Sequence, residues 1–387
     1  MTIRFLIMNA YAVGGTIRTT LNTAAELSRR HDVEIVSVYR RREAPALPLC
    51  PAVRLRTLVD LRPRERSRWE TWALAQRSRL VHPQEVRYDR FSVLTDVALL
   101  RFLRSVGDGV LVGTRPGLNL AIARFARRSV VRVGQDHMNL GSYKPGLRAA
   151  IARAYRRLDM VTALTQGSVG EYAALLEGRT RVEWVPNAAP DMGGLRADTD
   201  AKRVVAAGRL ARRKGFDRLL RAWARVAQGR AGWELWIFGA GPEKPRLRAL
   251  AHELGVDAGV RLAGQTSRMA EELAASSLFA LSSRREGFPM VLLEAMGVGL
   301  PVVAFDCPTG PRDIVSDGVD GYVVPDGDVA ALAAALAELM DDAGRRRRFG
   351  AAALDKAARF ERAAIAARWE TLLGELAAGK PRDRRPG

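Results

Sequence analysis

Two carboxylates and the start of a short helix share one stretch of the sequence, EGFPMVLLE, which runs from Glu286 to Glu294. The Gly-Phe-Pro turn predicts a helix that begins on Pro289, and the first N–H groups of a helix have no partners inside it. The backbone from Phe288 to Val291 therefore suits a phosphate, because a helix N-terminus attracts anions. The two carboxylates suit sugar and ribose hydroxyls. Because Glu286 stands in the loop and Glu294 on the second helical turn, they can hold different parts of one elongated ligand; the alternative for Glu294 is a solvated helix residue.

A second stretch, GRLARRKGF, places two cations on a loop that follows the apolar run RVVAA. Arg209 and Lys214 lie between Gly208 and Gly215, and each can neutralise a separate oxygen of a diphosphate. An Arg-rich chain also carries such residues as plain surface charge. The loop indicates a diphosphate site only in combination with the EGFPMVLLE motif.

Two loops in the first half also follow predicted strands. In AYAVGGTIRTT, Gly14 and Gly15 let backbone N–H groups approach a ligand, but the loop is neither a P-loop nor a GxGxxG fingerprint. A structural tight turn is an equal alternative. In RVGQDHMNLG, His137 follows a strand, although a lone histidine is usually structural. The polar residues near it that could face a ligand are Gln135, Asp136 and Asn139.

The elements that must position these residues follow from the periodicity. Apolar, β-rich runs alternate with Ala-, Leu- and Arg-rich helical stretches along the chain, which predicts an α/β protein wound on parallel sheets. In such sheets, ligands collect at the carboxyl ends of the strands. The pattern restarts near residue 203 after GGLRADTDAK, a polar stretch typical of a linker. We therefore expect two Rossmann-like domains, residues 1–195 and residues 201–359.

The last helical stretch carries Ile365, Trp369, Leu372 and Leu373 at helical spacing, so it has one apolar face. We expect this helix, residues 360–378, to cross back and complete the first domain. Residues 379–387 are expected to form a basic tail.

Charge and composition exclude several classes of protein. The net charge is +20, but the chain shows no helix-turn-helix, zinc-finger or ribonucleoprotein pattern and has only 6% aromatic residues, which disfavours a nucleic-acid partner. Cys50 and Cys307 lie far apart without metal-ligand spacing, so neither a disulfide framework nor a zinc site is indicated. No apolar window is long enough for a spanning helix, and the N-terminal run is interrupted by Asn9, as expected for a strand rather than a signal peptide.

Residues 62–80, RPRERSRWETWALAQRSRL, combine arginines with Trp69 and Trp72. This mixture is expected of a basic amphipathic element on an anionic membrane. The equal alternative is an Arg-rich helix that packs its tryptophans against the first domain.

In order and spacing, these motifs resemble the retaining glycosyltransferases of family four, also called group 1. EGFPMVLLE is similar to the E-x7-E signature of that family, GRLARRKG to its diphosphate loop, and VEWVPNAAP to the segment that closes its first domain. The resemblance covers nearly the whole chain and is most specific over residues 203–340. It implies the GT-B fold, two facing Rossmann-like domains with a cleft between them. In that fold, residues 1–195 would form the acceptor side and residues 201–359 would bind the nucleotide sugar.

The resemblance also assigns roles to residues. It implies that Arg209 and Lys214 hold the donor diphosphate, that Glu294 holds the ribose hydroxyls, and that the base lies near residues 261–264. Glu286 would contact the transferred sugar, and His137 would reach it from the first domain; these two are the expected catalytic residues. The expected donor-binding residues are Gly14, Gly15, Arg209, Lys214, Gly264, Gly287, Phe288, Pro289, Met290, Val291 and Glu294.

The implied reaction transfers a hexose from a nucleoside-diphosphate sugar, expected to be UDP-linked, with retention of anomeric configuration. It requires no cofactor and no metal, because cations and helix ends stabilise the leaving diphosphate. Asp198 and Asp200 have the spacing of a metal motif but lie in the expected linker. The segment CPTGPRDI looks like versions found among polyol-phosphate and cell-envelope glycan transferases. We therefore expect an anionic or lipid-linked acceptor and a cytoplasmic enzyme at the inner face of the membrane.

Three alternatives remain at the level of sequence. One is the same chemistry on a small soluble acceptor. Another is a non-catalytic protein that binds a nucleotide sugar or nucleic acid, although none of the expected site residues is missing. A dinucleotide-dependent oxidoreductase is disfavoured, because GAGPEK lacks the third glycine of the fingerprint.

Overall fold

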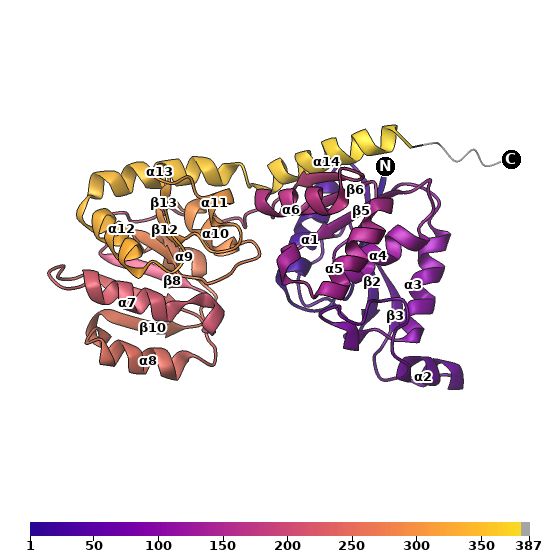
Figure 1. Cartoon of the computed structure of the whole chain (residues 1–387), viewed down its shortest axis with the longest axis horizontal. Coiled ribbons are helices and arrows are strands. Elements are labelled where there is room, and N and C mark those ends of the chain that lie inside the picture. Colours follow the sequence, from indigo (N-terminus) through magenta and orange to yellow (C-terminus); the bar gives the residue numbers. More distant parts are fainter. Residues whose placement is uncertain (381–387) are drawn as a thin grey trace. The chain divides into compact units, whose positions relative to one another are not determined.

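The computed structural model describes residues 1–380, which form two compact units (Figure 1). The first unit comprises Met1–Ala188 and the chain from Arg362 onward, and the second comprises Ala189–Glu361. Each unit is built on one parallel sheet, which confirms the predicted α/β class with two Rossmann-like domains. Residues 381–387 of the predicted basic tail lie outside the described residues.

The sheet of the first unit has seven parallel strands in the order β3-β2-β1-β4-β5-β6-β7. In β1 (Thr2–Ile7), an inner strand, Phe5 pairs with Ile35 on one side and Val112 on the other. Helices cover both faces, so inner strands such as Val110–Gly113 and Met160–Ala163 are buried along their whole length. The strands are β1 (Thr2–Ile7), β2 (Asp32–Arg40), β3 (Arg54–Asp60), β4 (Val110–Gly113), β5 (Val131–Asp136), β6 (Met160–Ala163) and β7 (Arg181–Trp184).

Two separate hydrophobic cores hold the helices of this unit to the sheet. One contains Leu21 and Leu27 of the first helix, and the other contains Leu99, Leu118 and Tyr172 of later helices. Helix starts carry side-chain caps where the sequence allows, as at Thr165, whose Oγ1 accepts from the N–H of Ser168 at 3.1 Å. The helices are α1 (Gly15–Leu27), α2 (Arg68–Ala75), α3 (Val93–Ser105), α4 (Pro116–Phe125), α5 (Pro145–Ala154) and α6 (Gln166–Leu176), with short 3₁₀ turns η1 (Tyr88–Arg90), η2 (Leu140–Ser142) and η3 (Tyr155–Arg157).

The second unit has six parallel strands in the order β10-β9-β8-β11-β12-β13. They are β8 (Arg203–Ala207), β9 (Glu234–Phe238), β10 (Val260–Gly264), β11 (Leu278–Leu281), β12 (Val302–Phe305) and β13 (Gly321–Val324). The helices are α7 (Phe216–Val226), α8 (Lys244–Glu253), α9 (Met269–Ala274), α10 (Met290–Gly297), α11 (Pro311–Ile314), α12 (Val329–Asp341) and α13 (Ala343–Ala358), with η4 (Arg212–Lys214) and η5 (Asp257–Gly259). Trp223 and Leu336 are fully buried between α7, α12 and the sheet.

The polar stretch expected to link the domains is held by the second unit. The N–H of Ala197 donates to the carbonyl of Val298, and the N–H of Asp198 donates to the carbonyl of Ala274, both at 2.7 Å. These bonds attach the stretch to the ends of α10 and α9.

The last helix, α14 (Arg362–Ala378), belongs to the first unit, as its apolar face predicted. Trp369 is 1% exposed and meets the ring of Phe5 edge-on at 6.3 Å between centroids. Phe360, the first residue of the predicted helix range, instead lies buried in the second unit against Phe288. The helix therefore begins two residues later than expected.

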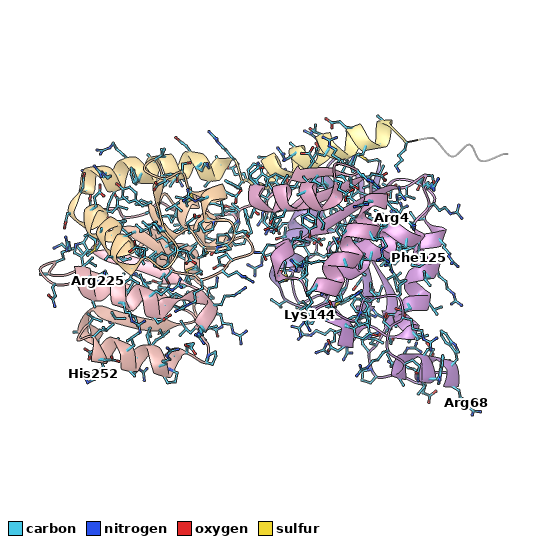
Figure 2. All side chains as sticks on the ribbon, in the orientation of Figure 1. Arg4, Arg68, Phe125, Lys144, Arg225 and His252 are labelled. Carbon is cyan, nitrogen blue, oxygen red and sulfur yellow. The ribbon has the colours of Figure 1, made fainter. Side chains whose placement is uncertain are left out.

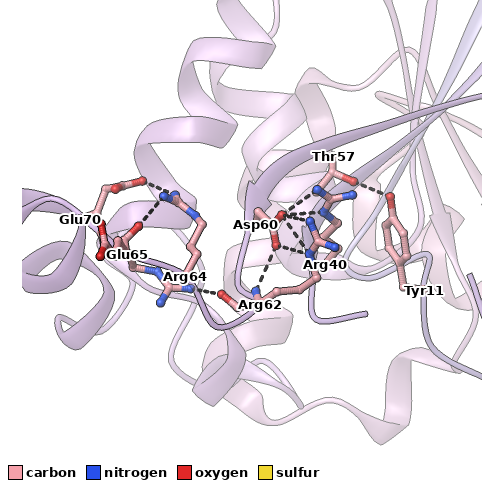
Figure 3. A network of polar contacts seen from close by, with 9 residues as sticks. Tyr11, Arg40, Thr57, Asp60, Arg62, Arg64, Glu65 and Glu70 are labelled. Carbon is pink, nitrogen blue, oxygen red and sulfur yellow. Dashed lines mark hydrogen bonds and ion pairs between the residues drawn. The ribbon is translucent and has the colours of Figure 1, made fainter. Parts of the chain in front are cut away.

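A polar network ties the segment before α2 to the edge of the first sheet (Figure 3). Asp60, at the end of β3, accepts hydrogen bonds from Arg40 at 2.6 Å and from Arg62 at 2.8 Å. These bonds, led by the one from Arg62, hold the pKa of the Asp60 carboxyl well below its usual range. Arg64 donates to Glu70 within α2 at 2.5 Å. The network fixes α2 to the sheet although the helix is short.

The tryptophans of α2 do not enter the core. Trp69 is 47% exposed and Trp72 is 54% exposed, so the packing alternative for this segment is wrong. Arg68, at the start of the same helix, lies at the outer edge of the first unit (Figure 2). Within residues 1–380, no helix combines the length and apolarity needed to span a bilayer.

Candidate active site

A lysine, a serine and a glutamate meet at the carboxyl ends of β8 and β11. The ammonium of Lys214 donates to Oε1 of Glu286 at 2.6 Å, and the hydroxyl of Ser283 donates to the same oxygen at 2.5 Å. Glu286 is 5% exposed, so this carboxylate needs the partners it has. Oε2 of Glu286 accepts no hydrogen bond within the described part of the chain. One oxygen is thus fixed while the other is available to a ligand.

The loop that carries Lys214 can approach β11 only because the next residue is glycine. Gly215 has a φ of +64°, and a Cβ there would lie 2.0 Å from the carbonyl oxygen of Ser282. The hydroxyl of Ser282 donates to the carbonyl of Lys214 at 3.1 Å, which closes the contact from the other side. Glycine is therefore a requirement of the site and not only a flexible residue.

An ion pair between Arg284 and Asp217 stabilises the contact between the Lys214 loop and the residues after β11. Arg284 donates to both carboxylate oxygens of Asp217, at 2.8 and 2.7 Å. This fork holds the pKa of Asp217 at about 2, since the bonded form of the carboxyl is the ionised one. The pair joins the loop after β11 to the start of α7.

The Gly-Phe-Pro turn leads into α10, which begins at Met290, one residue later than predicted. Hydrogen bonds from the N–H of Glu286 to the carbonyl of Pro308 (2.9 Å) and from the N–H of Thr309 to the carbonyl of Glu286 (3.2 Å) fix the turn. The amide of Met290 donates to the carbonyl of Phe288, so it is already used. The amides of Gly287, Phe288 and Val291 donate to no acceptor among residues 1–380. These three can receive an anion.

A cavity of about 330 Å³ lies over this arrangement. It brings Glu286, Glu294 and Lys214 together with the turn and the first residues of α10. The expected donor-binding residues in its lining are Lys214, Phe288, Pro289, Met290, Val291 and Glu294.

A neighbouring cavity of about 430 Å³ shares Ala207, Gly208 and Met269 with the first. Arg209 lines it and is exposed. The Arg209 side chain makes no ion pair or hydrogen bond within residues 1–380. The two predicted cations therefore line neighbouring cavities, Arg209 in one and Lys214 in the other.

The position expected for a base differs in detail from the structure. Gly264 ends β10 and accepts from the N–H of Gly239 at 2.6 Å, but the cavity lining is formed by the next two residues, Gln265 and Thr266. Arg261 pairs instead with Glu234 at 3.1 Å. The sequence reasoning missed Gln265, Thr266 and Met269; the rule that ligands gather after strand ends could have found the first two.

A third cavity, of about 510 Å³, lies at the carboxyl ends of the strands of the first unit. His137 lines it together with the turn of Gly14 and Gly15. Burial lowers the pKa of His137 to about 4, so the imidazole is neutral near pH 7. Nε2 of His137 has no hydrogen-bond partner among the described residues. The first unit therefore holds a neutral, buried ring nitrogen without a hydrogen-bond partner beside a glycine turn.

Asp136, next to His137 in the chain, points away from this cavity. It is 2% exposed and accepts from the hydroxyls of Tyr172 and Tyr155 and from the amide of Asn119 at 3.0 Å. Burial raises its pKa to about 7 against the opposing hydrogen bonds. Asp136 thus orders the strand end that presents His137 and does not face a ligand.

The predicted site residues therefore form two groups, one in each unit. His137, Gly14 and Gly15 share the cavity of the first unit, and the remaining residues lie in the second. Among residues 1–380, no cluster of three or more His, Cys, Asp or Glu side chains is suited to a metal ion.

Comparison with known proteins gives matches over the whole chain. The family model described as "Glycosyl transferases group 1" matches residues 190–356. An exopolysaccharide phosphotransferase of Streptomyces coelicolor is 35% identical over 400 residues, covering 100% of this chain and 42% of that protein. The chain thus spans less than half the length of this relative.

Two further matches cover most of the length of the matched protein. The amylovoran biosynthesis glycosyltransferase AmsD of Erwinia amylovora is 30% identical over 276 residues, covering 69% of this chain and 77% of AmsD. The structure of S. aureus TarM in complex with fondaparinux, α-GlcNAc-glycerol and UDP matches with a TM-score of 0.73 at 14% identity, covering 96% of this chain and 99% of TarM. The last likeness is one of fold.

Proposed function

Because the chain belongs to the group 1 glycosyltransferases, we propose that it transfers a hexose from a UDP-linked sugar to an anionic or lipid-linked acceptor of the cell envelope, with retention of configuration. The observation that carries this proposal is the cavity in which Lys214, Glu286, Glu294 and the start of α10 lie together. Cations and free amides suit the diphosphate, and carboxylates suit hydroxyl groups. A nucleotide sugar is the ligand that contains both.

Each residue has a part in this reaction. Lys214, Arg209 and the amides of the turn stabilise the negative charge that builds on the leaving diphosphate. Glu294 holds the ribose hydroxyls. Glu286, whose Oε1 is fixed by Lys214 and Ser283, binds the transferred sugar through Oε2.

His137 acts on the donor sugar as a neutral hydrogen-bonding group. Its low pKa means that it carries no positive charge near neutral pH, so Nε2 can exchange a hydrogen bond with a hydroxyl. This role requires the cavity of the first unit to meet the donor during catalysis. We also propose that the reaction proceeds without a metal or cofactor, with the cations and amides of the second unit serving the diphosphate.

The acceptor is inferred from the relatives and from charge. The S. coelicolor relative is named for exopolysaccharide, AmsD is named for amylovoran biosynthesis, and TarM was crystallised with a glycosylated glycerol. The net charge of +20 favours an anionic acceptor. The protein would act at the inner face of the membrane, where the exposed Trp69 and Trp72 of α2, beside the arginine-rich residues 62–68, contact anionic lipid.

The donor site is tested by calorimetric titration of UDP, GDP, ADP and their sugars without metal. We expect selective binding of UDP and a UDP-sugar by the wild type, and loss of binding in the Arg209→Ala/Lys214→Ala double variant. Arg213→Ala is the matched control, because Arg213 is exposed on the same loop and lines neither cavity. Absence of nucleotide binding in the folded wild type, or an equal loss in the control, would overturn the proposal.

A further inference from the structure

The cavity of the first unit is strongly cationic, which the donor chemistry does not require. Four arginines and a single carboxylate, Glu85, occur in its lining. The arginines are Arg41, Arg87, Arg90 and Arg115. They come from the loop after β2, from the segment around η1, and from the loop before α4, so no local sequence pattern groups them.

One of the four arginines, Arg115, forms a buried ion pair inside the first unit. Arg115 donates to Oε1 of Glu85 at 2.7 Å, and the side chain of Glu85 is 2% exposed. The other oxygen of Glu85 accepts from the N–H of Gly117 at 2.7 Å. This buried pair neutralises itself and fixes the start of α4, so it adds little net charge to the cavity.

The other three arginines keep their charge. Within the described residues, Arg41 and Arg87 have no carboxylate partner. Among residues 1–380, Arg90 pairs only with its chain neighbour Asp89, at 3.1 Å, and the side chain of Asp89 is 68% exposed. Such exposed pairs are weak, and solvent competes with them.

The positive charges converge on one part of the cavity. Tyr39 lines the cavity, and the guanidinium of Arg41 lies 5.8 Å from the centre of its ring. Burial raises the pKa of the Tyr39 hydroxyl, and the charges of Arg41, Arg90 and Arg115 act against that rise. Two unneutralised arginines from separate segments, Arg41 and Arg90, therefore act on the same hydroxyl, and Arg87 lines the same cavity.

We propose that Arg41, Arg87 and Arg90 form a subsite for a phosphate group of the acceptor, at the rim of the cavity that contains His137. The inference rests on the proposed function, because it places the acceptor hydroxyl near His137. Guanidinium groups recognise phosphate through paired N–H donors, and exposed arginines do so without leaving a buried charge behind. The phosphate can come from a polyol-phosphate chain or from a lipid diphosphate, because both offer the same group.

The test uses three probes: a short oligo(glycerol phosphate), a short-chain lipid diphosphate monosaccharide, and neutral maltotriose. Binding to the whole chain is measured by calorimetry at low salt, with UDP titrated separately. The test variant is Arg41→Gln/Arg87→Gln/Arg90→Gln. The matched control is Arg42→Gln, because Arg42 is an exposed neighbour that does not line the cavity.

We expect the wild type to bind at least one phosphate probe and not maltotriose. Each arginine should contribute roughly three- to tenfold in Kd, so the triple variant should weaken phosphate binding roughly 30- to 1,000-fold. Binding by the wild type should weaken with added salt, and the variant should lose most of that dependence. Which phosphate probe binds identifies the source of the phosphate.

Three results would overturn the proposal. They are failure of both phosphate probes to bind, an equal loss in Arg42→Gln, and a matching loss of UDP affinity in the triple variant, which would assign the arginines to the donor. UDP affinity depends on Arg209 and Lys214 in the other unit, so failure of the donor site gives a different pattern. In turnover assays, the triple variant should raise KM for the acceptor and leave kcat nearly unchanged.

Discussion

Replacing Gly215 by alanine tests whether the contact between the Lys214 loop and β11 builds the donor site. The added Cβ meets the carbonyl oxygen of Ser282 at 2.0 Å, whereas ordinary contacts begin at 3.4 Å. The residue is also held at a φ of +64°, which costs an L-residue about 1–2 kcal/mol. Relief of the overlap requires the loop or strand to shift, and overpacking of this kind costs about 1–3 kcal/mol more.

Gly255→Ala is the matched control for the backbone term. Gly255 lies in the same unit with a φ of +67°, but a Cβ there meets nothing within 4 Å. Backbone strain should lower the free energy of unfolding of both variants, and only Gly215→Ala should be destabilised further by the steric overlap with Ser282. For a unit of this length the difference corresponds to roughly 2–12 °C in Tm, at about 2–4 °C per kcal/mol.

The assay is differential scanning calorimetry of both variants, followed by UDP titration. Gly215→Ala should melt below Gly255→Ala and should also bind UDP more weakly, because the shift displaces Lys214 beside it. Equal melting temperatures would show that the loop relaxes without cost. Unchanged UDP affinity in a destabilised Gly215→Ala would refute the link between this contact and the donor site.

Two further predictions concern pH and membranes. Burial raises the pKa of Asp136 from 3.8 to about 7 in the folded chain, so the folded chain holds a proton that the unfolded chain loses, and the free energy of unfolding falls as pH rises from about 4 to 7. Burial lowers the pKa of His137 from 6.5 to about 4, so this side chain makes the free energy of unfolding rise between about pH 4 and pH 6.5. Urea titrations across that range should show Asp136→Asn removing the fall and His137→Gln removing the opposing rise, and unchanged pH profiles would contradict both assignments. The Trp69→Ser/Trp72→Ser variant should lose binding to phosphatidylglycerol vesicles at unchanged Tm, because both side chains are about half exposed. Vesicle sedimentation measures this binding, and binding equal to that of the wild type would show that α2 does not contact the membrane.

Much of the proposed donor site could be predicted from the sequence because its residues lie close together along the chain. Glu286, Glu294 and the turn between them belong to one strand-loop-helix unit, and such a unit has few ways to fold. The start of α10 was still misplaced by one residue, since Pro289 caps the helix instead of entering it. Gly264 was named where Gln265 and Thr266 line the cavity, because the spacing gives a strand end but not the direction of each side chain.

The sequence alone determined the α/β class, the two sheets, the loop and turn proposed to bind a diphosphate, and the helix that returns to the first unit, since each depends on periodicity or on short-range spacing. Only the tertiary structure decided that Asp136 is enclosed by Tyr155 and Tyr172 while its neighbour His137 faces a cavity. It also decided that Arg41 lines the same cavity as Arg87 and Arg90, although they come from two separate segments. Burial and convergence depend on which distant residues pack together, and no local pattern in the chain encodes that arrangement.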